Sequence, residues 1–561
     1  MSLIGSLNTG LTGVLTNQKA VEITGNNVAN VNTPGYSRQF AKLSPNMAIN
    51  IHGHIIGQGV NVQEICREYD HFISGQLLNQ HNSLGKESAK SQPLAELERV
   101  FNIGDDSLAS DIERFFGAWH DLSQNPAGQV ERNRVLYEGN NLLNSFSKTK
   151  NELVKIKQNI NVNLNAKVDE INLKIQEVAK LNESIRSKEV LGNVANDDRD
   201  RRDLLLNDLS HILGVQTYQC EHGQIGVQLP GGLPLVQGNN ALGFESYYDS
   251  DNNTQFRIKT GDIIFQTDKN NFGGEFRGYQ DIRDTFIPEL EKNLDELQYS
   301  IVTQVNAQHE TGFGLDGLTG RSFFSKPISY RSETGFTDPN SADFMTGSID
   351  INGTTILIDE DNNSLNGIKD AINDSDTGVL ASVVYDGTAY YLDLTPQSQG
   401  DDVVFASNLT SGPGTLSFND EDGDPELFNR RAEAQNIIVE LKSTQQVAVA
   451  GATPGAPGDN KNALSIFALF NAQVIHGEES FMECCGRMFS TVGTEARSNT
   501  MALGGASDTL TQLENMREAS VGVSIEQEII NLTLFQRGFE ACCTYVSTID
   551  EMMSTVLNMK R

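Results

Sequence analysis

The residues most able to do chemistry are scattered along this chain rather than grouped in a known catalytic spacing. The nine histidines lie far apart, and the sequence contains no HExxH, GxSxG or P-loop motif. His52 and His54 could lie on one face of a strand, but no nearby Cys or third His would complete a tetrahedral metal site. The sequence therefore predicts that the chain is not an enzyme and that it holds no cofactor.

The six cysteines do not change this interpretation. Cys484–Cys485 and Cys542–Cys543 are adjacent pairs, and adjacent side chains point apart and do not have C-x-x-C spacing. Cys542 falls on an apolar helical stripe, which favours a small core residue. A bridge between the two pairs stays open at this stage, as does the redox state of these thiols.

The segment DEDNNSLNGIKD at 359–370 comes nearest to a metal site, since it partly resembles a calcium-binding loop. Asp359, Asp361 and Asn363 occupy the first, third and fifth positions of such a loop. The sixth position holds Ser364 in place of Gly, and the twelfth holds Asp370 in place of Glu. An acidic turn on a solvated domain is the simpler interpretation, so we predict no metal site. The residues that would bind calcium in the alternative interpretation are Asp359, Asp361, Asn363 and Asp370.

Charge and composition exclude several classes of partner. The 42 basic and 74 acidic residues among 561 give a net charge of −32, which disfavours nucleic acid and anionic membranes alike. No apolar run approaches the roughly 20 residues that a membrane helix needs. The uncharged N-terminus, MSLIGSLNTGLTGVLTNQ, also lacks the basic start and dense apolar core of a secretory signal. The chain is predicted to stay in the cytoplasm or to leave by a route that needs no such signal.

Both ends of the chain carry an apolar stripe with steps of three and four residues, the spacing of a coiled coil. Neither stripe has enough partner surface in an isolated helix, so we predict that the two helices pair and take part in assembly. The predicted assembly residues are Ile4, Leu7, Leu11, Val14, Val21 and Val28 near the N-terminus, and Ile529, Leu532, Phe535, Phe539, Cys542, Val546, Ile549 and Met553 near the C-terminus.

Between these ends the chain alternates between long helices and β-rich segments. Residues 128–189 contain no proline and only one glycine, which predicts a helix roughly 90 Å long. Gly-Pro turns separate short strand-like runs at 214–275, and 19 acidic residues but one basic residue lie between Arg331 and Arg430. The predicted fold class is mainly α with β-rich inserts and a terminal coiled coil.

We predict three domains. Residues 1–65 with 518–561 form a terminal coiled-coil assembly domain. Residues 66–319 with 441–517 form a long-helix domain that includes the small β region. Residues 320–440 form an acidic, β-rich outer domain.

The segment ANVNTPGYSRQ directly follows the first helix and predicts a tight turn, because Pro34 fixes φ beside an Asn- and Gly-rich sequence. The residues that define this turn motif are Asn30, Thr33, Pro34, Gly35 and Tyr36. This segment resembles the N-terminal signature of bacterial flagellar rod, hook and hook-associated proteins. GQGVNVQEICREYDHFISGQL at 57–77 and the segments at 287–324 and 520–559 resemble the hook-associated members of that family. The segment at 350–394 resembles a small β insert found in several flagellins and hook-associated proteins.

The resemblance implies a structural adaptor between the flagellar hook and filament, in the extracellular flagellum. It implies export in an unfolded state by the flagellar type III pathway and ring assembly through the terminal helices. The implied partners are further copies of the chain, hook protein, the next hook-associated protein on the flagellin side, and an export chaperone on the C-terminal helix. Two alternatives stay open: a hook- or rod-type axial subunit, and an acidic, adhesin-like module carried on a flagellar scaffold.

Overall fold

The computed structural model describes residues 3–51, 54–102, 104, 107–249, 253–261, 263–325, 330–332, 336–341, 347–359, 362–375, 377–385, 389–396, 405–407, 437–451, 458–475 and 479–559. The chain divides into two compact units, each built from several segments. Unit 1 comprises Met1–Pro93, Ile160–Ile282 and Arg497–Arg561. Unit 2 comprises Leu94–Asn159 and Arg283–Ala496. The three-domain division predicted from the sequence stays a prediction.

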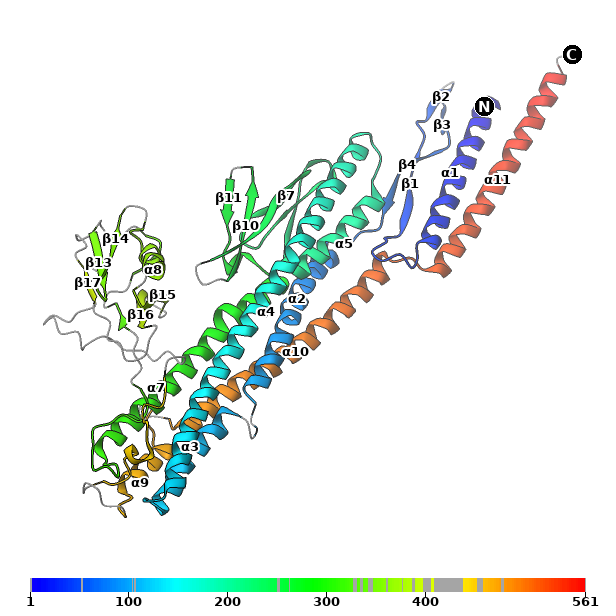
Figure 1. The fold of residues 1–561 in the computed structure, drawn as a ribbon. Helices are drawn as coiled ribbons and strands as arrows, with labels where there is room; N and C mark the ends of the chain where they lie inside the picture. Colours follow the sequence, from blue (N-terminus) through cyan, green and yellow to red (C-terminus); the bar gives the residue numbers. More distant parts are fainter. Residues whose placement is uncertain are drawn as a thin grey trace. The chain divides into compact units, whose positions relative to one another are not determined.

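Three long helices contribute to both units, namely α2 (His71–Val100), α4 (Gln129–Val190) and α10 (Phe481–Val521). The 62-residue α4 confirms the long helix predicted from its spacing. The predicted mainly α class with β-rich inserts is also confirmed, and Figure 1 shows the long helices with the small sheets beside them.

Unit 1 contains both terminal helices and two small sheets. Its helices are α1 (Leu3–Ala29), α5 (Asn196–Leu213), α6 (Gly274–Asp281) and α11 (Ile525–Asn558). Its strands are β1 (Gln39–Pro45), β2 (Ile49–Ile51), β3 (His54–Ile56), β4 (Val60–Arg67), β5 (Gln216–Gln219), β6 (Ile225–Gln228), β7 (Pro234–Gln237), β8 (Asn240–Ala241), β9 (Gly243–Tyr248), β10 (Thr254–Thr260) and β11 (Ile263–Gln266). Antiparallel pairing gives the ribbons β1-β4 and β2-β3 and the sheets β5-β6-β7-β8 and β11-β10-β9.

Asparagines on one face of α4 fasten the β region of unit 1 to the helix. Asn161 and Asn172 accept from the backbone N–H groups of Thr254 and Phe244 at 3.2 and 3.0 Å. Asn182, which is fully buried, donates to the carbonyls of Ile225 and Gly238 at 2.8 and 2.7 Å. These amides satisfy strand groups that would otherwise be buried without partners.

Unit 2 is built on an aromatic core and carries the acidic β segment. Its remaining helices are α3 (Leu108–Gln124), α7 (Ile287–Thr311), α8 (Leu365–Asn373) and α9 (Lys461–Ala468). Its strands are β12 (Tyr330–Arg331), β13 (Gly347–Ile351), β14 (Thr354–Ile358), β15 (Val379–Tyr385), β16 (Tyr390–Pro396) and β17 (Phe405–Ser407), in the orders β12-β16-β15 and β14-β13-β17. The predicted cap Ser107 accepts from the N–H of Ser110 at 3.2 Å and starts α3, whose Phe115, Phe116 and Trp119 are fully buried.

Candidate assembly site

The two terminal helices pair along their length within unit 1. Figure 1 shows α1 and α11 side by side, with both chain ends at the same end of the pair. Gly10 lies against Val546, Gly13 against Cys542, and Asn17 against Gly538, so the helices run antiparallel. A Cβ built on Gly13 would come within 2.7 Å of the Cys542 sulfur. The close approach therefore depends on the missing side chain at this position.

On α1, small residues and not the predicted apolar stripe are buried against α11. The small residues Ser6, Gly10, Gly13, Thr16 and Ala20 are buried, and so is Ile23 nearer the end of the helix. Of the predicted stripe, Leu7, Val14, Val21 and Val28 are half-buried, whereas Ile4 and Leu11 are 72% and 49% exposed. The closest contacts with α11 are therefore made at small residues of α1, because small side chains permit a closer helix approach than branched ones. An assembly role for the stripe stays a prediction.

On α11, the residues that face α1 follow the predicted spacing. Ile549 is buried, whereas Ile529 is 53% exposed and lies off this face. The remaining predicted residues, Leu532, Phe535, Phe539, Cys542, Val546 and Met553, are half-buried. The opposite side of the helix also carries exposed apolar residues, including Ile530, Leu534, Met552 and Val556 at 66%, 62%, 51% and 54%.

The turn motif ends α1 and leads the chain into β1. The N–H of Thr33 donates to the carbonyl of Asn30 at 2.9 Å, and the N–H of Tyr36 donates to that of Thr33 at 3.2 Å. Gly35 has φ of 78°, a left-handed conformation that glycine adopts without strain. The Tyr36 hydroxyl donates to the side-chain oxygen of Asn27 at 2.9 Å. Burial and the nearby Asp197, Asp200 and Glu528 raise the pKa of this hydroxyl, so it stays a neutral donor.

A buried polar cluster connects this turn to the start of α11. The Glu528 carboxylate is 1% exposed and accepts from Arg38 Nε at 2.8 Å and Asn27 Nδ2 at 3.0 Å. Asn27 also exchanges two hydrogen bonds with the backbone of Gln39, at 2.8 and 3.0 Å. The N–H of Arg38 donates to the carbonyl of Val521 at 2.9 Å, so the end of α10 is held at the same place.

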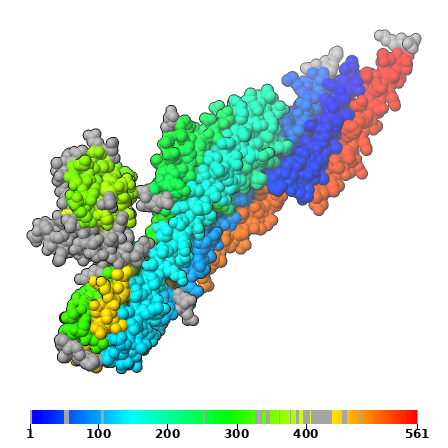
Figure 2. Space-filling view, viewed as in Figure 1, coloured from blue at the N-terminus to red at the C-terminus, as the bar shows by residue number. Residues whose placement is uncertain are grey.

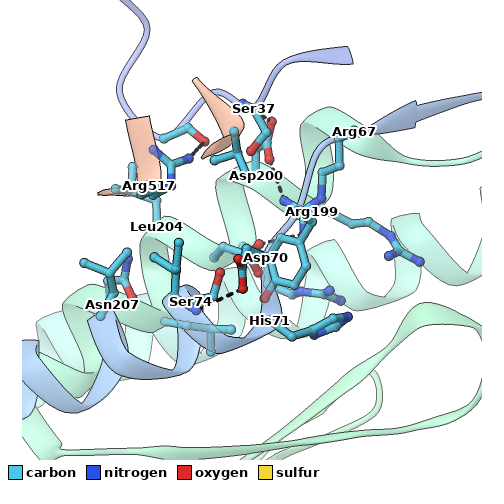
Figure 3. Close-up of a pocket in the computed structure, with 18 of the residues that line it drawn as sticks. Ser37, Arg67, Asp70, His71, Ser74, Arg199, Asp200, Leu204, Asn207 and Arg517 are labelled. Atoms are coloured by element: carbon cyan, nitrogen blue, oxygen red, sulfur yellow. Dashed lines mark hydrogen bonds and ion pairs between the residues drawn. The ribbon is translucent and has the colours of Figure 1, made fainter. Parts of the chain in front are cut away.

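A pocket of about 1250 Å³ lies beside this turn, between β4, α2, α5 and the end of α10. Figure 3 shows Asp200 between Ser37 and Arg67. The Asp200 carboxylate accepts from the N–H of Ser37 at 2.9 Å and from Arg67 at 2.5 Å, and Arg67 also reaches Asp203 at 2.7 Å. Arg517 donates to the carbonyl of Gly35 at 2.9 Å. The pocket wall is thus an ion-pair network that fastens the turn to α5 and α10.

Burial is the main cause of the pKa shifts of Asp200 and Arg202 in the pocket wall. It raises the pKa of Asp200 above its usual range, although Arg67 and the Ser37 N–H act in the opposite direction. It also lowers the pKa of Arg202 to about 10. Arg202 therefore stays charged near neutral pH, and the Asp200 carboxylate is paired with Arg67.

The described residues show neither a metal-binding group nor a disulfide, although Cys66 and Cys220 line the pocket. Among the described residues, no group of three or more His, Cys, Asp or Glu side chains is arranged to hold a metal ion. Asp361 and His52 lie outside the described residues, and Asp370 pairs with Lys369 at 3.2 Å, so the calcium loop stays a hypothesis. All six thiols are free, and burial raises the pKa of Cys484 to about 11 and that of Cys485 to about 12.

Sequence reasoning missed the polar cluster and the pocket network. Asn27, Arg38 and Glu528 lie 11 to 501 positions apart in the chain, and no spacing rule links them. One signal was available: Glu528 interrupts the apolar face of α11 one turn before Leu532, where a lone carboxylate needs a partner.

No described helix is both long enough and apolar enough to cross a membrane. Residues 94–324 match the flagellar hook-associated protein FlgK helical domain. Residues 7–36 match the flagella basal body rod protein family, and residues 518–559 match the C-terminal family of the flagellar basal body rod FlgEFG proteins. The ends of the chain are therefore of a kind shared with rod proteins, whereas the middle is similar to a hook-associated domain.

Whole-chain similarities point the same way. The chain is 24% identical to flagellar hook-associated protein 1 of Escherichia coli strain K12 over 99% of both chains. It is 25% identical to the protein of that name from Bacillus subtilis strain 168, over 96% of this chain and 95% of that protein. The fold is similar to the flagellar hook junction protein FlgK from Burkholderia pseudomallei, with a TM-score of 0.58 and 18% identity, over 80% of this chain and all of that one.

The fold and these similarities define a structural protein of the bacterial flagellum. Within that class, the chain is similar to flagellar hook-associated protein 1 along nearly its whole length, and its middle matches the helical domain of FlgK. A family of structural flagellar proteins agrees with a site that is made for packing and in which the described residues form no metal centre.

Proposed function

We propose that the chain is the structural adaptor that joins the flagellar hook to the filament, and that it assembles through its terminal helices. The observation that carries this proposal is the apolar surface that α1 and α11 leave exposed after they pair. Ile4, Leu11 and Leu15 on α1 are 72%, 49% and 56% exposed. Figure 2 shows α1 and α11 side by side, with one side of the pair uncovered in this view. Apolar stripes of this length on a soluble protein mark a protein–protein contact.

The partners in this proposal are those that the similarity to flagellar hook-associated protein 1 suggests. Further copies of the chain form a ring, with hook protein on one side and the next hook-associated protein and flagellin on the other. Before assembly, an export chaperone covers the outer side of α11, where Ile530, Leu534 and Val556 would otherwise favour aggregation. The chain travels unfolded through the flagellar type III pathway, guided by an N-terminal region that is not cleaved, and becomes extracellular.

A gene deletion in the source bacterium tests the adaptor role. Electron microscopy should show bare hooks, and flagellin should accumulate in the medium because filaments have nothing to grow on. A plasmid copy of the gene should restore filaments. Normal filaments in the deletion strain would rule out the adaptor role and direct attention to a binding function of the acidic segment.

A further inference from the structure

We infer that the buried cluster of Asn27, Arg38 and Glu528 sets the register of α11 against α1. The register in turn fixes the position along the helix axis at which the outer side of α11 meets a neighbouring copy. The role of the cluster in pairing α1 with α11 does not depend on the proposed function. Its consequence for a neighbouring copy rests on the proposed function.

The packing between α1 and α11 does little to fix how far one helix is shifted along the other. On α1 the buried residues from Ser6 to Ala20 are all small, namely Ser6, Gly10, Gly13, Thr16 and Ala20, and Ile23 is the one large apolar residue among the buried positions of this helix. Coiled-coil register normally depends on large side chains that fit into holes on the partner helix. A stripe of glycine, alanine, serine and threonine offers few such features, so helices can approach closely at several relative positions.

A slide of one heptad, about 10 Å along the axis, would nearly reproduce the apolar contacts. In the structure Cys542 lies over Gly13. After such a slide Ile549 would lie over Gly13 and Cys542 over Ala20, so an apolar residue would again meet a small one. Apolar packing alone therefore leaves at least two registers close in free energy.

The polar cluster does not repeat along the helices. Glu528 is the buried carboxylate of α11, and its two oxygens are matched separately by Arg38 at 2.8 Å and Asn27 at 3.0 Å. Asn27 is itself fixed by Gln39 and Tyr36, and Arg38 by the carbonyl of Val521. A heptad slide would carry Glu528 two turns away from Asn27 and leave charged groups buried without partners. Buried polar groups of this kind are known to select one register at some expense of stability.

An exchange of two residues one heptad apart on the same face of α11 tests this directly. The variant Glu528→Phe with Phe535→Glu keeps the composition but moves the carboxylate by seven positions. We expect α11 to slide until the new carboxylate at position 535 meets Asn27 and Arg38. The first two turns of α11 would then become part of the segment that connects α11 to α10. A photoreactive benzoylphenylalanine at Leu7 reads the register in the purified full-length chain. Its cross-link, mapped by mass spectrometry, should move from about residues 548–549 to about residues 555–556 of α11.

The apolar variant Asn27→Leu, Arg38→Met, Glu528→Met is the second test, since it removes the buried charges together and needs no slide. It should stay helical by circular dichroism yet give cross-links in two registers a heptad apart. An unmoved cross-link in a folded exchange variant would overturn the inference, as would a single native register in the apolar variant. Because these cross-links are read on the purified chain, a wrong adaptor role would show in the deletion strain without altering them.

Discussion

At the scale of single residues, Glu528 shows how burial and hydrogen bonding together hold a charge inside a small interface. Its carboxylate is 1% exposed, and its main partners come from the end of α1 and from the turn that follows. Arg38 has an alternative partner, since it also lies 3.6 Å from Glu68 at the surface. Without Glu528, Arg38 keeps Glu68 and Asn27 keeps the backbone of Gln39, so the expected loss of stability is moderate for a buried ion pair.

Glu528→Ala should destabilise the α1–α11 pair by about 2 kcal/mol, because buried donors lose their acceptor. Hydrogen–deuterium exchange of α11 amides in the full-length chain measures this, and exchange should accelerate roughly 30-fold. The matched control is Glu22→Ala, which removes an exposed pair with Lys19 and should change exchange by less than about twofold. Equal effects of the two substitutions would contradict a special role for the buried carboxylate.

His309 makes unit 2 sensitive to acid. The ring is fully buried, with Nδ1 2.7 Å from the carbonyl of Arg321 and Nε2 accepting from the N–H of Ala448 at 2.9 Å. Burial lowers its pKa from 6.5 to about 4, against weaker opposing effects of the Arg321 carbonyl and Glu310. The unfolded chain binds this proton more readily, so the contribution to stability is complete above pH 6.5 and is lost as the pH falls toward 4.

The loss between pH 6.5 and 4 should amount to about 3 kcal/mol. Urea unfolding at several pH values measures it, and Trp119, the single tryptophan of the chain, reports on this core because its ring lies 6.0 Å from that of His309. His309→Gln should lower stability at pH 7 but flatten the dependence over this range. An unchanged pH dependence in the variant would assign the acid sensitivity to other groups.

At the scale of elements, the close approach of α1 and α11 depends on glycines that a hydrophobic pattern does not detect. Gly10→Ala would place a Cβ 2.6 Å from Val546 Cγ2 and should destabilise the helix pair by about 1–3 kcal/mol. Gly25 on the same helix has no atom within 4 Å of its ideal Cβ position. Gly25→Ala should therefore stabilise α1 by up to about 1 kcal/mol.

Thermal unfolding of the two variants, followed by circular dichroism, should show shifts of opposite sign. Shifts of the same sign would mean that helix propensity, not the contact with α11, decides stability at Gly10. The comparison is well matched because both substitutions add one methyl group to the same helix.

The sequence predicts elements well where one periodicity dominates, as in α4, α3 and the apolar face of α11. It fails where contact depends on absence of a side chain or on residues far apart. Leu7 and Leu11 carry the strongest apolar signal on α1, yet Gly10 and Gly13 make the closest contacts. Likewise, the TPGYSRQ turn is evident from its composition, but its ties to Asp200, Arg517 and Glu528 are three-dimensional.

At the scale of the whole molecule, the proposed assembly requires surface that the folded chain leaves uncovered. The outer side of α11 is the clearest such surface, and it can be altered without disturbing the face that packs on α1. Leu534 is 62% exposed, whereas Phe539 is half-buried toward α1. Substitutions at these two positions therefore separate a loss of assembly from a loss of folding.

Leu534→Asp should leave the purified chain as stable as the wild type, yet cells that carry it should have bare hooks and release flagellin into the medium. Phe539→Asp should give the same cellular result but also loosen α11, because a carboxylate cannot be buried against α1 without a partner. Gln536→Asp, at an exposed polar position, is the control and should support normal filaments. If Leu534→Asp also built normal filaments, the outer side of α11 would not be an assembly surface, and contacts between copies would have to be sought on α1 alone.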